Sequence, residues 1–107
     1  MERNSMITLF IRYTLDPHKL MEFERYAKTW PEVVLRYGGE LIGYFAPTKI
    51  AGPTNVAYAL IQFPTLAVYE QYRESLMSDP EVVENVRRVE ESETILVEER
   101  SFVRQVV

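Results

Sequence analysis

The sequence predicts a small α+β domain in which helices cover one face of a four-stranded antiparallel sheet. Stretches rich in β-branched and aromatic residues alternate with stretches whose apolar residues recur every three or four positions, the patterns of strands and helices. The 107 residues suffice for one hydrophobic core, so a single domain is expected over residues 1–107. Apolar residues fill both faces of two predicted strands, which predicts a sheet without a solvated face.

The first strand is predicted over residues 6–15, where one face is apolar and the other is mixed. Asp16 and Pro17 predict a helix directly after it, because Asp accepts hydrogen bonds from first-turn N–H groups and Pro fits the first helical position. This helix is expected to pack on the sheet through a stripe formed by Leu20, Phe23, Ala27, Trp30 and Val34.

Two signals shape the end of this helix. Pro31 lacks a backbone donor and crowds the preceding turn, so a kink or a restart is expected near Thr29. Gly38 and Gly39 then end the helix, because glycine readily adopts the left-handed conformation found there.

The second half of the chain repeats the alternation of strands and helices. Strands are predicted over residues 40–47 and 55–63, as an antiparallel pair joined by a loop that contains Gly52 and Pro53. Thr65 predicts the start of a helix through Met77, and Asp79-Pro80 the start of another that ends near Ser92. The last strand is predicted over residues 94–104. The apolar stripes of these helices are Leu66, Tyr69, Tyr72 and Leu76, with Arg73 at the edge, and then Val82, Val86 and Val89.

The resulting order is the split βαβ, or ferredoxin-like, pattern. It places both helical regions on one face of the sheet and leaves the other face uncovered. In the third predicted strand, the alternating residues are apolar on both faces of the sheet. In the second, one face is expected to carry Leu41, Gly43 and Phe45, and the other Ile42, Tyr44 and Ala46. Because such a face would be a large apolar patch on a monomer, we expect a homodimer through sheet faces, centred on Gly43 and Tyr58. An unrelated partner protein is the alternative cover.

Composition limits the possible partners. The net charge of −4 disfavours nucleic acid and anionic membranes. Without cysteine there is no disulfide, thiolate nucleophile or thiolate-held metal. The N-terminal residues lack the layout of a signal peptide, and no apolar run approaches a membrane span of about 20 residues. A cytoplasmic location is therefore expected, and no cofactor is expected.

Several short motifs resemble those of the NIPSNAP family in the dimeric α/β-barrel superfamily. They are Gly-Glu-Leu-Ile-Gly-Tyr-Phe from Gly39, Gly-Pro-Thr-Asn from Gly52, and Tyr72-Arg73 with Asp79-Pro80-Glu81. The resemblance implies a homodimer whose two sheets stack into a barrel, with a cavity between sheet and helices in each subunit. The superfamily includes cofactor-free monooxygenases, haem-binding enzymes and small-molecule isomerases, so the resemblance leaves the reaction open.

A ligand pocket is the first candidate site. Aromatic walls with polar tips hold flat organic molecules, and a phenol can exchange a proton. The alternative is that these residues are ordinary core. The candidate pocket residues are Tyr13, Phe23, Trp30, Tyr44 and Tyr58.

Three polar residues are further candidates. His18 is the only histidine and stands near a predicted helix start, where an exposed side chain without a role is expected. Glu40 is a possible base or a solvated strand end. Arg73, like Arg12, is a possible carboxylate anchor or the partner of a glutamate of the last strand.

No metal site is predicted, because the glutamates near residue 90 lack His or Asp at ligand spacing. The sequence therefore supports a small-molecule site, with monooxygenase or isomerase chemistry as one alternative. A non-catalytic protein-interaction or sensor module is the other.

Overall fold

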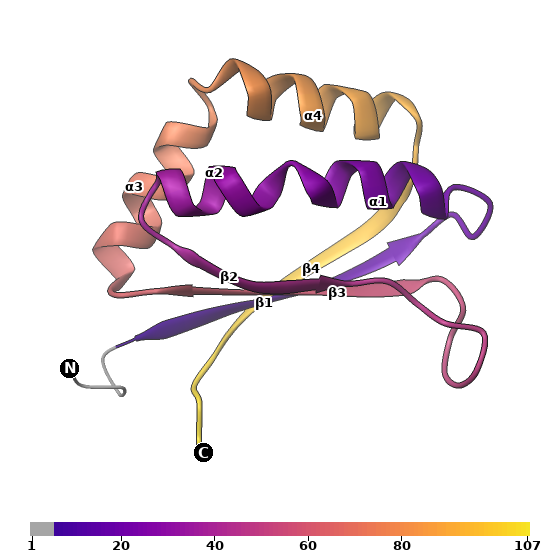
Figure 1. Cartoon of the computed structure of the whole chain (residues 1–107), viewed down its shortest axis with the longest axis horizontal. Coiled ribbons are helices and arrows are strands. Elements are labelled where there is room, and N and C mark those ends of the chain that lie inside the picture. Colours follow the sequence, from indigo (N-terminus) through magenta and orange to yellow (C-terminus); the bar gives the residue numbers. More distant parts are fainter. Residues whose placement is uncertain (1–5) are drawn as a thin grey trace.

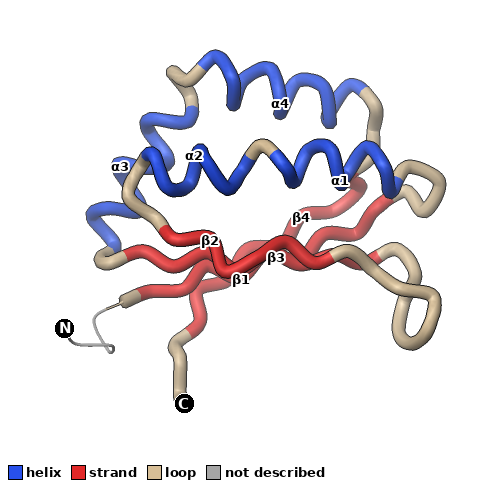
Figure 2. Tube along the Cα trace, in the orientation of Figure 1, coloured by secondary structure: helices blue, strands red, loops and turns tan. Residues whose placement is uncertain are grey.

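The computed structural model describes residues 6–107 and shows a four-stranded antiparallel sheet in the order β2-β3-β1-β4 (Figure 1). All helices lie on one side of the sheet (Figure 2). This is the ferredoxin-like arrangement that the element order predicts. The elements are β1 (Ile7–Leu15), α1 (Leu20–Lys28), α2 (Trp30–Arg36), β2 (Glu40–Phe45), β3 (Val56–Phe63), α3 (Leu66–Leu76), α4 (Pro80–Glu91) and β4 (Ile95–Val103).

The core lies between β1, β3 and the helices. Strand β1 is central and pairs with β3 on one side and β4 on the other. Its odd-numbered residues from Leu9 to Leu15 are buried beneath the helices, and alternate residues of β3, Ala57 to Phe63, share this burial. The predicted parity of β1 is confirmed.

The first helix begins later than Asp16 and Pro17 predict. The Asp16 carboxylate accepts a hydrogen bond from the His18 N–H at 2.9 Å, and the Asp16 carbonyl accepts one from the Lys19 N–H at 3.0 Å. These bonds close a turn, and α1 starts only at Leu20. The predicted restart near Thr29 is confirmed, because α1 ends at Lys28 and Pro31 occupies the first turn of α2, where no donor is needed.

Strand β2 contains an irregularity that the alternating pattern did not predict. Leu41 pairs with Ile61 and Gly43 pairs with Leu60, so Ile42 is an inserted residue. Leu41 and Tyr44 consequently both pack against the helix-side core, while Ile42 and Phe45 remain 49% and 47% exposed. The predicted grouping of Leu41, Gly43 and Phe45 on one face is therefore wrong.

Side chains cap the last two helices as predicted. The Thr65 hydroxyl accepts a hydrogen bond from the Val68 N–H at 3.2 Å, and the Asp79 carboxylate accepts one from the Glu81 N–H at 2.9 Å. Asp79 also contacts α2, since Arg36 Nη1 lies 2.6 Å from Asp79 Oδ2. The hydroxyl of Tyr37 donates to the same oxygen at 2.5 Å.

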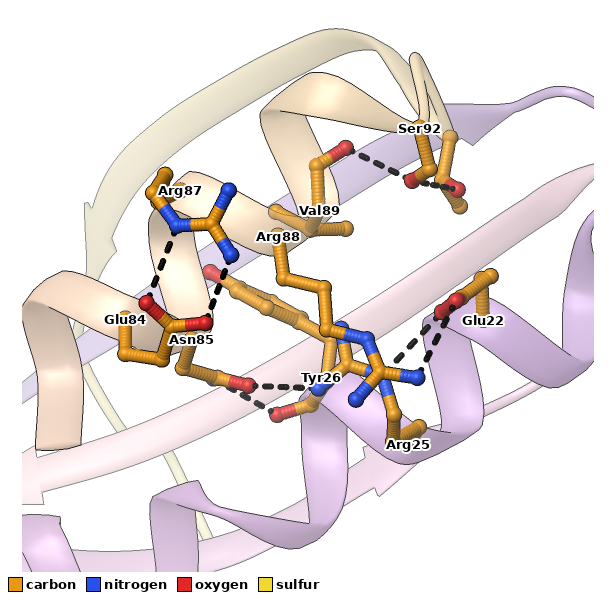
Figure 3. A network of polar contacts seen from close by, with 10 residues as sticks. Glu22, Arg25, Tyr26, Glu84, Asn85, Arg87, Arg88, Val89 and Ser92 are labelled. Atoms are coloured by element: carbon orange, nitrogen blue, oxygen red, sulfur yellow. Dashed lines mark hydrogen bonds and ion pairs between the residues drawn. The ribbon is translucent and has the colours of Figure 1, made fainter.

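Helix α4 packs against α1 through polar as well as apolar contacts. The side chain of Asn85 donates to the Tyr26 carbonyl at 3.1 Å and accepts from Arg25 Nη1 at 3.2 Å (Figure 3). Glu22 accepts a hydrogen bond from Arg25 Nε at 3.1 Å. These contacts fix α4 relative to the helix that covers the sheet.

The face of the sheet opposite the helices is uncovered and carries apolar side chains together with polar ones such as Arg12, Glu99 and Ser101. Phe10 and Tyr58 stack there with ring centroids 5.6 Å apart, beside an Arg12–Glu99 ion pair of 3.0 Å. That pair confirms the predicted internal partner of Arg12. We call this surface the open face, defined by Phe10, Phe45, Tyr58, Leu60, Val97 and Val103. Within residues 6–107, no helix is long and apolar enough to cross a membrane.

Candidate functional site

Aromatic side chains from β1, α1 and β2 meet between the sheet and the helices. The ring centroid of Tyr13 lies 5.1 Å from that of Phe23 and 6.0 Å from that of Tyr44. Phe23 and Tyr44 are 6.0 Å apart. Three of the five predicted pocket residues therefore form one cluster, as expected from their parity and helical spacing.

Two hydroxyl groups of this cluster form a hydrogen bond. The hydroxyl oxygens of Tyr13 and Tyr44 lie 3.1 Å apart. Burial raises the pKa of both phenols well above the ordinary value of about 10. Both are therefore neutral near neutral pH, and they act there as hydrogen-bond donors or acceptors rather than as bases.

The cluster continues toward the start of α2. Trp30 is 5% exposed, and its ring centroid lies 5.7 Å from that of Tyr26. Among residues 6–107 its indole Nε1 has no hydrogen-bond partner although it is buried. Burial also raises the pKa of Tyr26, to about 12, and that of Tyr72. Tyr26 was not predicted as a site residue, although it lies three positions after Phe23 and shares its helix face.

An open groove borders this cluster along the edge strand β2. It has a volume of about 500 Å³ and lies between α1, α2 and β2. Phe23 and Tyr44 connect it to the buried cluster, and Glu24 and Lys28 are its charged residues. We call it the β2 groove; its remaining lining residues are Ala27, Pro31, Leu41, Gly43 and Ala46.

A second, smaller hollow lies on the other side of α1. Its volume is about 230 Å³, and it is formed between α4 and β4. We call it the α4–β4 hollow; its lining residues are Tyr26, Val86, Val89, Glu90, Ile95 and Glu98. Arg100 Nε donates to Glu98 Oε2 at 2.7 Å beside it. Glu98 is one of the glutamates of the last strand that the sequence predicts only as ion-pair partners of Arg12 or Arg73.

The other predicted site residues do not join the aromatic cluster. Tyr58 pairs with Arg12 and Phe45 on the open face, so its prediction as a pocket residue together with Tyr13 is wrong. The prediction failed because β3 carries apolar side chains on both of its faces, so the sequence does not show which face Tyr58 occupies. His18 is exposed in the turn before α1, Glu40 is exposed at the first position of β2, and Arg73 is exposed on α3.

Metal-ligand residues are scattered over the described part of the chain. Within residues 6–107, no three His, Asp or Glu side chains come together as a group that could hold a metal ion. The candidate site therefore consists of phenols, aromatic walls and two charged residues at the β2 groove.

These features define an α+β protein of ferredoxin-like fold with an aromatic cluster between its sheet and its helices. The chain belongs to the NIPSNAP family, whose sequence profile it matches over residues 8–107. The resemblance of its motifs to that family is thereby confirmed. No curated protein matches the sequence.

Solved structures of the same fold support the architecture. An uncharacterized NIPSNAP-like domain protein from Burkholderia xenovorans superimposes with a TM-score of 0.80 at 24% identity, covering 96% of this chain and 87% of its own. A NIPSNAP family protein with unknown function from Agrobacterium tumefaciens superimposes with a TM-score of 0.80 at 23% identity, covering 97% of this chain and 91% of its own. A putative antibiotic biosynthesis monooxygenase from Bacteroides thetaiotaomicron superimposes with a TM-score of 0.66 at 16% identity, covering 99% of this chain and 94% of its own. At these identities the likeness concerns the fold.

Proposed function

We propose that the chain binds a small, flat organic molecule in the β2 groove and does so as a homodimer. The observation that carries the proposal is the groove itself, about 500 Å³ in volume with mainly apolar walls. Ligand sites in proteins are typically such concave, apolar surfaces with a few polar groups.

The polar residues of the groove suggest what the ligand carries. Lys28 offers a positive charge and Glu24 a negative one, at successive turns of α1. The ring of Tyr44 forms part of the inner wall of the groove, and its hydroxyl group is hydrogen-bonded to the hydroxyl group of Tyr13 in the core. A flat ligand with an aromatic body and a hydroxyl or carbonyl group matches this wall.

Binding is better supported than catalysis by a base. A cofactor-free monooxygenase or an isomerase needs a group that accepts a proton from its substrate. Burial keeps Tyr13 and Tyr44 protonated, which suits them to donate a hydrogen bond. A likeness to a putative monooxygenase supports the shared fold, and the fold accommodates many chemistries.

The dimer is proposed from the open face. A stable interface buries about 1,200–2,000 Å² in total, and large exposed apolar patches usually mark interaction sites. A second copy presents the same surface, so a two-fold axis can bring the two open faces together. The groove lies on the helix side of each sheet and stays accessible in such a dimer.

A cytoplasmic location, testable by cell fractionation, belongs to the same proposal.

The test uses naphthol, a neutral and flat probe with one hydroxyl group, titrated into isotopically labelled protein and followed by amide NMR shifts. We expect shifts at Ala27, Leu41 and Ala46. The variant Ala27→Phe fills the groove and is expected to weaken naphthol binding by about tenfold or more, a loss of about 1.4 kcal/mol or more in binding free energy.

The matched control is Ala67→Phe, which makes the same change at an exposed position of α3 outside the groove. It is expected to bind naphthol as the wild type does. Equal binding by Ala27→Phe and wild type, or shifts confined to the open face, would refute the groove as the binding site.

A further inference from the structure

Aliphatic and acidic side chains both line the α4–β4 hollow. Val86, Val89 and Ile95 supply its aliphatic walls. Val89 belongs to the buried core, and Val86 and Ile95 are partly buried and pack against it. Glu90 and Glu98 supply the only formal charges among the lining residues of the hollow in the described chain. A hollow lined by both aliphatic side chains and carboxylates suits a molecule with an apolar body and a positive end.

Only one of these carboxylates is engaged in an ion pair. Glu98 Oε2 accepts a hydrogen bond from Arg100 Nε at 2.7 Å, which orients the Glu98 side chain. Among residues 6–107, neither Glu98 Oε1 nor the carboxylate of Glu90 forms a further hydrogen bond or ion pair. The net charge of Glu90, Glu98 and Arg100 together is −1, which attracts a cation.

The position of the hollow along α4 adds to this negative potential. Val86, Val89 and Glu90 belong to the last turns of α4, which ends at Glu91. The C-terminal end of a helix carries a partial negative charge and favours cations. Lys19 already donates from its ammonium group to the Ser92 carbonyl at this helix end. Lys19 therefore offsets part of the negative potential of this helix end, and the carboxylates of Glu90 and Glu98 remain as the groups that attract a further cation.

The buried phenol of Tyr26 is a second, independent feature of the hollow. Tyr26 is 5% exposed and lines the hollow. Its hydroxyl group lies close to the side chains of Trp30 and Tyr13. A hydroxyl oxygen has two acceptor lone pairs, so it can also accept a hydrogen bond from a ligand. Its aromatic ring can also attract a cation through the negative ring face.

We propose that the α4–β4 hollow is a binding site for a small organic amine in its protonated form. The ammonium group contacts Glu90 and the free oxygen of Glu98, and the apolar body packs on Val86, Val89 and Ile95. Tyr26 accepts a hydrogen bond from the ammonium group at its hydroxyl oxygen. This site is separate from the β2 groove, because α1 lies between the two sets of lining residues.

The experiment compares three probes of similar size that differ in charge: benzylamine, benzyl alcohol and benzoate. Each is titrated into labelled wild-type protein, with amide and methyl NMR shifts as the readout. We expect benzylamine to shift the resonances of Val86, Val89 and Ile95 and to bind more tightly than the other two. Naphthol binding at the β2 groove is measured separately, so a negative result with benzylamine can be told apart from a negative result with naphthol.

Two variants isolate the contribution of the carboxylate. Glu90→Gln removes one charge from the hollow and is expected to weaken benzylamine binding at least about fivefold, since a hydrogen bond to a charged group is stronger than one to a neutral group. Glu91→Gln removes the same charge from the next residue, which pairs with Arg87 at 2.9 Å outside the hollow. It is expected to change binding less than about twofold, because exposed charges are screened by salt.

A third variant, Tyr26→Phe, keeps the ring and removes the hydroxyl group. It is expected to weaken benzylamine binding while preserving the weaker binding of benzyl alcohol. Three results would overturn the proposal: equal affinity for benzylamine and benzyl alcohol, tighter binding of benzoate, or unchanged benzylamine affinity in Glu90→Gln. Thermal unfolding of each variant shows whether it is folded, and Glu90→Gln alters only an exposed side chain.

Discussion

The hydrogen bond between Tyr13 and Tyr44 connects the central strand to the edge strand through two side chains. Tyr13 is buried in the core, and Tyr44 lies between it and the β2 groove. A buried hydroxyl that loses its partner retains the cost of its desolvation. The pair therefore contributes to stability mainly because each hydroxyl satisfies the other.

The variant Tyr13→Phe tests this contribution. It leaves the Tyr44 hydroxyl without its partner, so we expect a loss of about 1–2 kcal/mol in the free energy of unfolding, measured by urea denaturation. Tyr69→Phe is the matched control, since Tyr69 is only partly buried and the structure records no hydrogen bond of its hydroxyl with the described residues. A change under about 0.5 kcal/mol is expected there. Equal losses would show that the Tyr13–Tyr44 bond is not the cause.

Individual residues also show where sequence reasoning succeeded. Tyr13 and Phe23 were placed correctly because strand alternation and helical spacing each assign a residue to a definite side. Tyr58 was misplaced because β3 is apolar on both faces, so parity alone could not select its side. Tyr26 and Glu98 were missed as site residues, since their proximity depends on how α1, α4 and β4 pack together.

At the scale of elements, Asp79 joins α2 and α4. It caps α4, forms an ion pair with Arg36 of α2 and accepts a hydrogen bond from Tyr37. The hydrogen bond from Tyr37 holds the pKa of this carboxyl below its ordinary value, and contacts with the Glu81 N–H and Arg36 add to the effect. The ionised form of Asp79 therefore stabilises the junction of α2 and α4.

The variant Asp79→Asn tests this junction by its pH dependence. Asn still caps a helix but carries no charge, so wild type should be more stable than the variant at neutral pH. Because the folded-state pKa is lowered, this advantage persists above the ordinary Asp pKa of about 4 and disappears as pH falls through the lowered value. Denaturation midpoints measured from neutral to strongly acidic pH check the prediction. Asp16→Asn, at a turn whose ion pair with Lys19 is 3.8 Å long, is the control and should show a smaller difference.

Elements were predicted from sequence more accurately than their irregularities. Thr65, Asp79 and Pro31 act locally, so two caps and the break between α1 and α2 follow from neighbouring residues. The start of α1 did not, because Asp16 closes a turn before the helix instead of capping it. The inserted Ile42 was also unforeseen, since a bulge depends on the pairing with β3 and leaves no clear signal in β2 alone.

At the scale of the whole molecule, the helices cover one face of the sheet and leave the open face uncovered. Leu60 lies near the middle of this face, paired with Phe10 on one side and Gly43 on the other. The ring of Phe45 covers Gly43, where a Cβ atom would lie 2.9 Å from the ring. The open face therefore presents a continuous surface of side chains from all four strands.

The variant Leu60→Glu tests the proposed dimer. A charge at the centre of two stacked sheets would be buried without a partner, so we expect monomers where wild type forms dimers, with mass measured by analytical ultracentrifugation. Val83→Glu adds the same charge on α4, where Val83 is 50% exposed, and is expected to leave the mass unchanged. Wild-type protein that sediments as a monomer at micromolar concentration would contradict the proposal.

The central position of β1 also governs how the chain folds. Leu9 pairs with Ile61 of β3 and with Phe102 of β4, so both neighbours of this strand come from much later in the sequence. Contacts of such long sequence separation slow folding, because the entropy of closing a long loop is lost before the contact forms. During synthesis, the apolar residues of β1 stay without strand partners until β3 emerges from the ribosome. The sheet reaches its final form only after residues 95–103 have followed.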